Sequence, residues 1–371
     1  MAIWSRGGLF PNCPGLTYLD DKACRVAAFS DFGKLFPSRK VPAPPQPSHL
    51  KRAASELQVG YQIAGKQLTI GDYLNRYPVT GFLVAKDDTI LFERYQYGRT
   101  DKHTLTSFSM AKTITGLLVG LALERKAIRS IDDTADVYVP ELKGTEYGRT
   151  PLRALLQMAS GVKFSEAYGD RSSDIYTLAR LTLEQDPVGI VGALPRFNTR
   201  LHPPGEWFNY SSAESLVLGL VVARSMRRSI SELTSELLWR PLGAEADASW
   251  NVDARGQEVT YAYYNAVVRD WARLGLMLAH RGEWAGQRIV PERWVTEATT
   301  VQPGWPSPVY GYHVWISHLN RNAFYLMGLR GQFVTVNPTL RLVIVQTSLD
   351  TNEFQTEEFT ALTVAIRELL R

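Results

Sequence analysis

The sequence predicts an α+β fold, in which an antiparallel sheet flanked by helices carries an inserted all-helical lobe. Three observations support this prediction. Segments with strand-like patterns occur near both ends of the 371-residue chain. Helical patterns dominate between about residues 136 and 248. A helix that is apolar on most of its circumference opens near Ser109.

These patterns divide the chain into an arm and two lobes. Residues 1–50 are rich in Gly, Pro and Asn and are expected to form an extended arm, with a proline-rich spacer at 41–47. Residues 51–135 and 249–371 are expected to build the α/β lobe, and residues 136–248 the helical lobe. A cleft between the lobes is the expected site.

The local elements follow in order. From Thr80 a hairpin is predicted around the turn Lys86–Asp88. Helices are expected at 152–158, at 175–183, after Ser211 and after Asn265; strands at 324–326, 332–336 and 340–346; and a closing helix at 354–370. Ser211 and Glu214 have capping-box spacing, which places Tyr210 just before a helix cap.

Composition excludes several classes of protein. The chain is 45% hydrophobic, which is enough for a large core, and its net charge of +4 is spread without a basic block. Nucleic acid is therefore not an expected partner. No apolar stretch is long enough to span a bilayer, and the opening residues lack a signal-peptide core. A cytoplasmic location and export with removal of a signal peptide both remain open.

The two cysteines, Cys13 and Cys24, lie in the N-terminal region. Neither has neighbours at metal-ligand spacing, so no metal site is expected. They form a disulfide in an oxidising compartment or stay as free thiols in the cytosol, and the sequence does not decide between these alternatives.

Ser109 and Lys112 are the main candidates for chemistry. In a helix, two residues three apart lie on one face, so their side chains can meet. Burial disfavours a charged lysine and lets it accept a proton, while a serine in the first helical turn lies at the positive end of the helix dipole. These are the parts of a nucleophilic acyl-transfer site. The alternative is a capping serine followed by a solvated lysine.

Other catalytic chemistries have weaker support. The six histidines lack a partner motif around a candidate nucleophile, so a Ser-His-Asp mechanism is the weaker enzyme option. Asp132 and Asp133 are more typical of a solvated turn than of a glycosidase pair. No glycine-rich phosphate loop is present, and no cofactor is expected.

Three ordered motifs carry a family resemblance. Ser109-x-x-Lys112, Tyr210-Ser211-Ser212 and the run 327–332 (MGLRGQ) before a strand resemble the motifs of the penicillin-recognising serine hydrolases. This superfamily includes class C β-lactamases, DD-peptidases and family VIII carboxylesterases, and the resemblance implies the β-lactamase/DD-peptidase-like fold. Within it, the chain is most similar to the nylon-oligomer (6-aminohexanoate-dimer) hydrolases.

The resemblance also implies roles for individual residues. Ser109 would be the acylated nucleophile, with Lys112 and Tyr210 sharing the proton as base and acid. The backbone N–H groups of Ser109 and Leu329 would form the oxyanion hole. Four further residues would contact substrate: Tyr168, Ser212, Gly328 and Arg330. A nearby Lys112 cation is expected to lower the pKa of Tyr210. Each of these roles has a structural alternative. Tyr210 and Tyr168 would then be structural aromatic residues, Ser212 would only cap a helix, and Arg330 would only be a surface charge.

The chain departs from the family pattern at three positions, one of which is Ser212, where β-lactamases usually have Asn. Leu326 and Met327 stand where a Lys-Thr pair normally binds the carboxylate of penicillins and peptides, and Arg330 is the one replacement cation nearby. The predicted function is therefore a serine hydrolase of carboxylic esters or small linear amides of the 6-aminohexanoate type. The alternatives are a β-lactamase or DD-peptidase proper, and a non-catalytic binding or sensor relative. The expected partner is a small-molecule substrate rather than a membrane, and a homodimer is compatible with the sequence.

Overall fold

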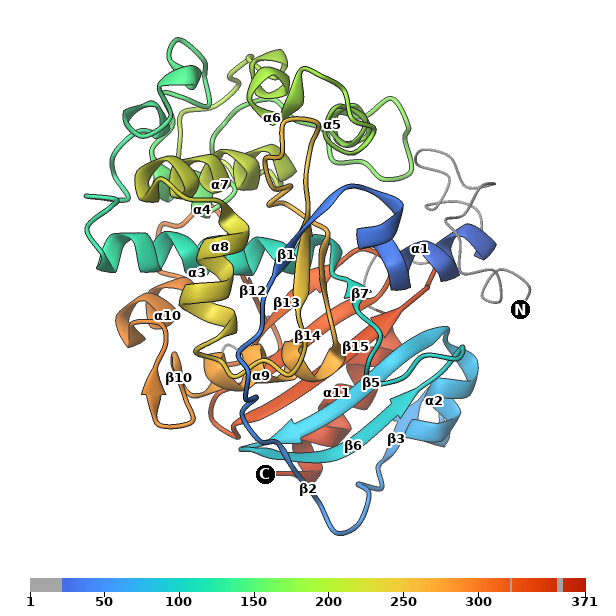
Figure 1. The fold of residues 1–371 in the computed structure, drawn as a ribbon. Coiled ribbons are helices and arrows are strands. Elements are labelled where there is room, and N and C mark those ends of the chain that lie inside the picture. The colour runs from blue at the N-terminus through green and yellow to red at the C-terminus, as the bar shows by residue number, and fades with distance from the viewer. Residues whose placement is uncertain (1–21, 321, 352–355) are drawn as a thin grey trace.

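The computed structural model describes residues 22–320, 322–351 and 356–371, and within them a seven-stranded sheet forms the centre of the molecule (Figure 1). Its strands, in spatial order, are β12 (Trp315–Ile316), β13 (Phe324–Gly328), β14 (Gln332–Asn337), β15 (Leu342–Ser348), β5 (Val79–Lys86), β6 (Thr89–Tyr95) and β2 (Lys51–Arg52). Neighbouring strands are antiparallel except for β2, which pairs parallel with β6. The expected antiparallel sheet drawn from both ends of the chain is confirmed.

Helices cover the two faces of this sheet because successive side chains point to opposite sides. Leu83 and Val343 belong to the larger core with α9 (Val268–Ala279), whereas Phe82 and Ile344 belong to a second core with α11 (Glu357–Leu369). All residues of β5 except the last are buried, as expected for a central strand covered on both faces. The predicted hairpin at 80–92 is therefore part of this sheet, as strands β5 and β6 between β15 and the edge strand β2.

The middle of the chain is mainly helical and lies above the sheet in Figure 1. Its helices, with the flanking ones, are α3 (Ala111–Glu124), α4 (Leu152–Leu156), α5 (Asp174–Leu183), α6 (Gly189–Ala193), α7 (Ser212–Met226) and α8 (Ile230–Thr234). The apolar helix α3 packs against α7, and α7 packs against α4. The division into lobes at residues 136 and 248 stays a prediction.

The N-terminal segment differs from the expected extended arm. Residues 22–35 form helix α1 (Lys22–Leu35), which is followed by strand β1 (Ser38–Val41). Phe29 and Phe32 are buried against the body, so the aromatic side chains favour a helix that docks instead of an open arm. β1 joins a four-stranded sheet in the order β1, β8 (Ala248–Asn251), β9 (Tyr264–Ala266) and β7 (Leu105–Thr106).

Cys24, which lies in α1, is disulfide-bonded. The only other cysteine of the sequence, Cys13, falls outside the described residues. A disulfide was one of the two alternatives that the sequence left open.

The prediction that Asn265 caps the helix after it is wrong. Asn265 lies in strand β9, and α9 begins after Val267 without a side-chain cap. The Asn265 amide instead donates to Asn251 Oδ1 at 3.0 Å, across the small sheet. A buried partner on a neighbouring strand therefore replaced the local capping bond.

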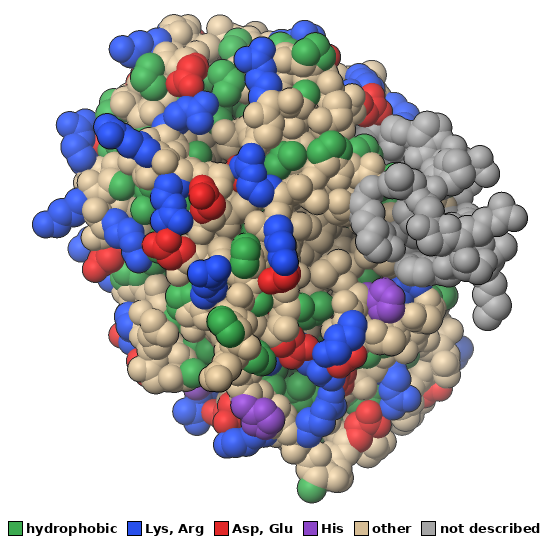
Figure 2. All heavy atoms as spheres, in the orientation of Figure 1, with side chains coloured by type: hydrophobic (Ala, Val, Ile, Leu, Met, Phe, Trp, Pro, Cys, Tyr) green, Lys and Arg blue, Asp and Glu red, His purple; other side chains and the backbone are tan. Residues whose placement is uncertain are grey.

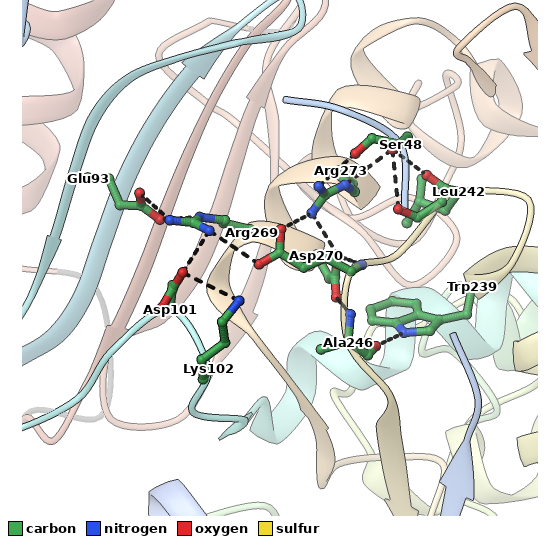
Figure 3. Close-up of polar contacts among 12 residues, drawn as sticks. Ser48, Glu93, Asp101, Lys102, Trp239, Leu242, Ala246, Arg269, Asp270 and Arg273 are labelled. Atoms are coloured by element: carbon green, nitrogen blue, oxygen red, sulfur yellow. Dashed lines mark hydrogen bonds and ion pairs between the residues drawn. The ribbon is translucent and has the colours of Figure 1, made fainter. Parts of the chain in front are cut away.

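An ion-pair network ties α9 to strand β6 and to Asp101 (Figure 3). Arg269 donates to Glu93 on β6 through Nε at 2.7 Å and through Nη2 at 2.9 Å, and it pairs with Asp101 at 2.8 Å. Arg273 donates to Asp270 at 2.9 Å, and both side chains are almost completely buried. This network fixes the position of α9, which packs against strands β5, β14 and β15 of the sheet.

Positive and negative side chains are interleaved on the face drawn in Figure 2. Among the described residues, no helix has the length and apolar character that a bilayer crossing requires.

Candidate active site

Ser109 lies in a short 3₁₀ helix (Phe108–Met110) that leads from β7 directly into α3. Phe108 has a φ of +44°, a left-handed conformation that costs a bulky residue free energy and tends to occur at functional sites. Its ring is held edge-on by Phe29 of α1 at 4.9 Å and by Tyr263 at 5.7 Å between centroids. The docked N-terminal helix therefore supports the strained turn that presents Ser109.

Lys112 lies on the first turn of α3 and is 1% exposed. Its Nζ is 2.9 Å from Ser109 Oγ, 3.1 Å from Ser212 Oγ and 2.9 Å from the carbonyl oxygen of Tyr261. Burial lowers the pKa of Lys112 to about 8, and the charge of Glu166 opposes this shift. The predicted contact between the serine and a lysine able to act as a base is present.

Ser212 and Tyr168 meet at a carboxylate that the sequence did not suggest. Glu166 accepts from the Ser212 backbone N–H at 2.6 Å, from Ser212 Oγ at 2.7 Å and from the Tyr168 hydroxyl at 2.6 Å. Ser212 is therefore engaged on both sides by protein groups, Glu166 and Lys112. Ser212 lines the smaller cavity beside Ser109, and its single hydroxyl proton is donated to Glu166, so its predicted contact with substrate stays a prediction.

Tyr210 precedes α7 and faces the same centre. Lys112 Nζ lies 4.9 Å from the centre of its ring, and the ring of Trp315 stacks on it at 5.5 Å. Burial and the charge of Glu166 raise the pKa of Tyr210, while a side-chain hydrogen bond with Ser109 acts in the opposite direction. The expectation that Lys112 lowers this pKa is wrong, because desolvation of the phenol dominates. Burial therefore favours the protonated phenol of Tyr210 over the phenolate.

The interpretation of Ser211 and Glu214 as a capping box is also wrong. Ser211 makes no side-chain cap, and Glu214 accepts from the backbone N–H of Ser160 at 3.2 Å and from its hydroxyl at 2.6 Å. Burial raises the pKa of Glu214 to about 8. Because Asn209 N–H also donates to the Met158 carbonyl, the loop before Tyr210 is held against the 158–160 segment by tertiary contacts.

Gly328 ends β13 beside the serine turn. A Cβ at this position would lie 2.1 Å from the carbonyl oxygen of Ser107, so only glycine permits this approach. The contact places the 328–329 backbone next to the segment that carries Ser109. Leu329 and Ser109 line the same two cavities, as expected of residues that share an oxyanion hole.

Arg330 is not brought to the centre with the other candidates. Its Nη1 donates to the carbonyl oxygen of Thr351 at 2.6 Å, and the residue is absent from the lining of both cavities at Ser109. Leu326 is 1% exposed in the core, and Met327 forms part of a cavity wall. No replacement for the missing cation therefore faces Ser109 from these described positions.

Two cavities lie at Ser109, and both are lined by Ser109, Tyr168 and Leu329. A cavity of about 220 Å³ is lined by Ser109, Glu166, Tyr168, Tyr210, Trp315, Met327, Gly328 and Leu329. A smaller one of about 30 Å³ is lined mainly by apolar and aromatic side chains, among them Phe108, Ile175 and Tyr261. Such a concave, mostly apolar wall with few polar groups is typical of a small-molecule site.

A larger hollow of about 830 Å³ lies at the other end of α3 and includes Arg153, Asp132 and Trp294. Several of its charged groups pair with each other, as Arg153 does with Asp132 at 2.7 Å. Its serine, Ser130, accepts from the Asp132 backbone N–H in an exposed turn and does not contact a buried lysine as Ser109 does, so size alone does not identify the site. No cluster of His, Cys, Asp and Glu suited to a metal ion occurs in the described ranges.

Sequence reasoning missed Glu166 and Trp315. Glu166 lies two residues before Tyr168 but belongs to no recognised motif, and Trp315 stands 105 positions after Tyr210. The only signal in the sequence was the proximity of Glu166 to Tyr168.

Comparison with known proteins agrees with this geometry. The sequence model of the family described as Beta-lactamase matches residues 69–367. A 6-aminohexanoate-dimer hydrolase of Paenarthrobacter ureafaciens is 28% identical over 345 residues, covering 86% of this chain and 84% of the relative. The structure is similar to a Bacillus anthracis protein provisionally described as a 6-aminohexanoate-dimer hydrolase, with a TM-score of 0.86, 25% identity and 95% coverage of each chain. A family VIII carboxylesterase shares the fold at a TM-score of 0.62 and 18% identity, over 80% of this chain and 94% of the other.

Proposed function

The chain belongs to the beta-lactamase family of hydrolases, and we propose that it cleaves carboxylic esters or small linear amides through an acyl-enzyme on Ser109. The observation that carries the proposal is the contact at 2.9 Å between the Ser109 hydroxyl and the buried Lys112 amine. A nucleophile next to a base with a lowered pKa is the arrangement that acyl transfer requires.

The reaction begins when Ser109 Oγ attacks the substrate carbonyl carbon and the hydroxyl proton passes to Lys112 Nζ. The carbonyl oxygen becomes an oxyanion, which the backbone N–H groups of Ser109 and Leu329 stabilise. Each such donor typically lowers the barrier by about 3 kcal/mol. The close approach of Gly328 to Ser107 supports this pairing of backbone donors.

The tetrahedral intermediate collapses when the bond to the leaving group breaks. Tyr210, a phenol that burial keeps protonated, donates its proton to the leaving oxygen or nitrogen. Lys112 then gives its proton to the Tyr210 phenolate, because burial makes this phenolate more basic than the lysine amine, and both groups return to their starting forms. In the second half, Lys112 takes a proton from water, and the resulting hydroxide attacks the acyl carbon. The bond between this carbon and Ser109 Oγ then breaks, Lys112 returns its proton to Ser109 Oγ, and the acid is released.

The cavity walls favour substrates without a carboxylate near the scissile bond. Glu166 is the one formally charged residue in the lining of the 220 Å³ cavity, and it is negative. Leu326 and Met327 supply no cation, and Arg330 is directed to Thr351. Esters with a neutral acyl chain are therefore the preferred class, and linear amides of the 6-aminohexanoate type are the narrower proposal, supported by the named relative.

The test compares wild type with Ser109→Ala on p-nitrophenyl butyrate, together with the exposed-site control Ser172→Ala. Loss of kcat by more than about 1,000-fold in Ser109→Ala alone supports the acyl-enzyme. Wild-type rates in Ser109→Ala would rule it out. A chromogenic cephalosporin serves as the carboxylate-bearing comparison, and turnover as efficient as that of the ester would favour a β-lactamase instead.

A further inference from the structure

We propose that Glu166 is a positioning residue that aims the lone pair of neutral Lys112 at Ser109, acting through the hydroxyl of Ser212. The inference rests on the proposed function, because it explains how Lys112 becomes a base toward one particular neighbour. It follows from counting the protons in a chain of four described hydrogen bonds.

The first step concerns Ser212. A serine hydroxyl has one proton to donate. Ser212 Oγ lies 2.7 Å from Glu166 Oε1, a carboxylate oxygen that only accepts, so the Ser212 proton is directed there. The contact of 3.1 Å between Lys112 Nζ and Ser212 Oγ must then be donated by the lysine.

The second step concerns Lys112. Its contact of 2.9 Å with the Tyr261 carbonyl oxygen is also donated by the lysine, since a carbonyl has no proton. A neutral amine has two hydrogens and one lone pair. Ser212 and Tyr261 engage both hydrogens, and the remaining neighbour is Ser109 Oγ at 2.9 Å. The lone pair therefore faces the proton that must be removed.

The third step concerns how Glu166 is held. Its Oε2 accepts from the Ser212 backbone N–H at 2.6 Å, and its Oε1 also accepts from the Tyr168 hydroxyl at 2.6 Å. These donors fix the carboxylate so that Oε1 faces the Ser212 hydroxyl. Ser212 itself is 1% exposed, so water does not compete for its proton.

The variant Glu166→Gln reverses the direction of this chain. The Ser212 backbone N–H needs an acceptor, so the amide oxygen occupies the place of Oε2 and the NH₂ group that of Oε1. The NH₂ group then donates to Ser212 Oγ, and the Ser212 proton turns toward Lys112. The Ser212 hydroxyl then donates to the lone pair of Lys112, and this lone pair is no longer available to accept the proton of Ser109.

The test is a double-mutant cycle on kcat for p-nitrophenyl butyrate with Glu166→Gln, Ser212→Ala and the double variant. Glu166→Gln should lower kcat at least about 100-fold, within the usual range for general-base catalysis. Ser212→Ala should lower it about 10-fold, because the amine loses an acceptor but its lone pair stays available. The double variant should be no slower than Ser212→Ala, so the second substitution rescues the first. Equal effects of Glu166→Gln in both backgrounds would overturn the proposal.

The pH profile gives a second readout that a merely structural role would not move. The charge of Glu166 raises the pKa of Lys112, so in Glu166→Gln the acidic limb of kcat/KM should shift to lower pH. The other groups facing Lys112 are the rings of Tyr210 and Tyr261 and the buried His313, whose pKa burial lowers to about 3. None of these changes charge near neutral pH. An unshifted limb would contradict the proposal.

Controls separate this proposal from the proposed function. Glu184→Gln removes an exposed carboxylate of the same lobe and should leave kcat within about twofold. If Ser109→Ala keeps activity, the acyl-enzyme itself fails; if Ser109→Ala is inactive while Glu166→Gln is fully active, only the role of Glu166 fails. Melting curves establish that each variant folds. Should Glu166→Gln not fold, Ser212→Ala alone decides: wild-type kcat would refute the proton chain.

Discussion

Lys112 Nζ lies 4.9 Å from the centre of the Tyr210 ring, so the lysine of one helix and the tyrosine that precedes another share a single buried centre. A cation over an aromatic face is stabilised, and this contact offsets part of the cost of protonating a buried lysine. The Tyr210 ring therefore has an electrostatic role that is separate from the role of its hydroxyl.

Substitution of Tyr210 by Phe separates these two roles. The ring and its stacking on Trp315 are retained, but the proton donor for the leaving group is lost. We expect kcat to fall about 100- to 1,000-fold with little change in thermal stability. Steady-state kinetics and a melting curve check this. Tyr310→Phe, which alters a ring 5.9 Å away, should keep near-wild-type kcat, and a similar loss in both variants would contradict the role of Tyr210.

Lys112 should reduce stability while enabling activity. Its folded pKa of about 8 is below the usual value of 10.5, so the unfolded chain binds more protons between these values. The destabilisation caused by burying Lys112 is therefore fully present below about pH 8. It decreases as the pH rises from about 8 to 10.5, so the free energy of unfolding increases over this range. Lys112→Met should be inactive and, at pH 7, more stable than wild type by about 1–3 kcal/mol.

Denaturant unfolding at pH 7 and pH 9.5 checks this prediction, and the gain should be smaller at the higher pH. The exposed Lys126→Met serves as the control and should change stability by less than about 0.5 kcal/mol at both values. A Lys112→Met variant that is less stable than wild type at pH 7 would show that the three hydrogen bonds of Nζ outweigh its burial.

Gly328→Ala should disable the oxyanion hole. The added methyl group would lie 2.1 Å from the Ser107 carbonyl oxygen, which forces the serine turn and the end of β13 apart. We expect kcat to drop at least about 100-fold. Gly169→Ala, for which no atom lies within 4 Å of the added carbon, is the matched control and should be neutral. Near-normal kcat in Gly328→Ala would remove Leu329 from the proposed oxyanion hole.

The Asp270–Arg273 pair should be a major determinant of stability. Asp270 accepts from Arg273 at 2.9 Å and from the backbone N–H groups of Glu245 and Ala246 (Figure 3). In Asp270→Asn an NH₂ group faces one of these donors, and the buried Arg273 loses one of its two carboxylate partners and keeps only Glu245. We expect a loss of about 3 kcal/mol in the free energy of unfolding, measured by denaturant titration. Glu297→Gln breaks the exposed pair with Arg293 and should cost less than about 0.5 kcal/mol.

Local sequence patterns were informative wherever the chain itself creates the structure. The hairpin at Lys86–Asp88 and the apolar helix after Ser109 depend on neighbours in the sequence, and both formed. The caps assigned to Ser211 and Asn265 failed because distant partners, Ser160 for Glu214 and Asn251 for Asn265, compete for the same polar groups. A capping bond is worth only about 1 kcal/mol, so a buried tertiary partner readily replaces it.

By itself, the sequence determined the fold class and the order of the motifs around Ser109, Lys112 and Tyr210, because helix periodicity and short spacings fix which side chains share one face. Only the tertiary structure decided that Glu166 joins Ser212, that Arg330 turns to Thr351 and that burial raises the pKa of Tyr210. These outcomes depend on burial and on hydrogen-bond partners from distant segments. Desolvation and hydrogen bonding act through space, so they are set only when the chain has folded.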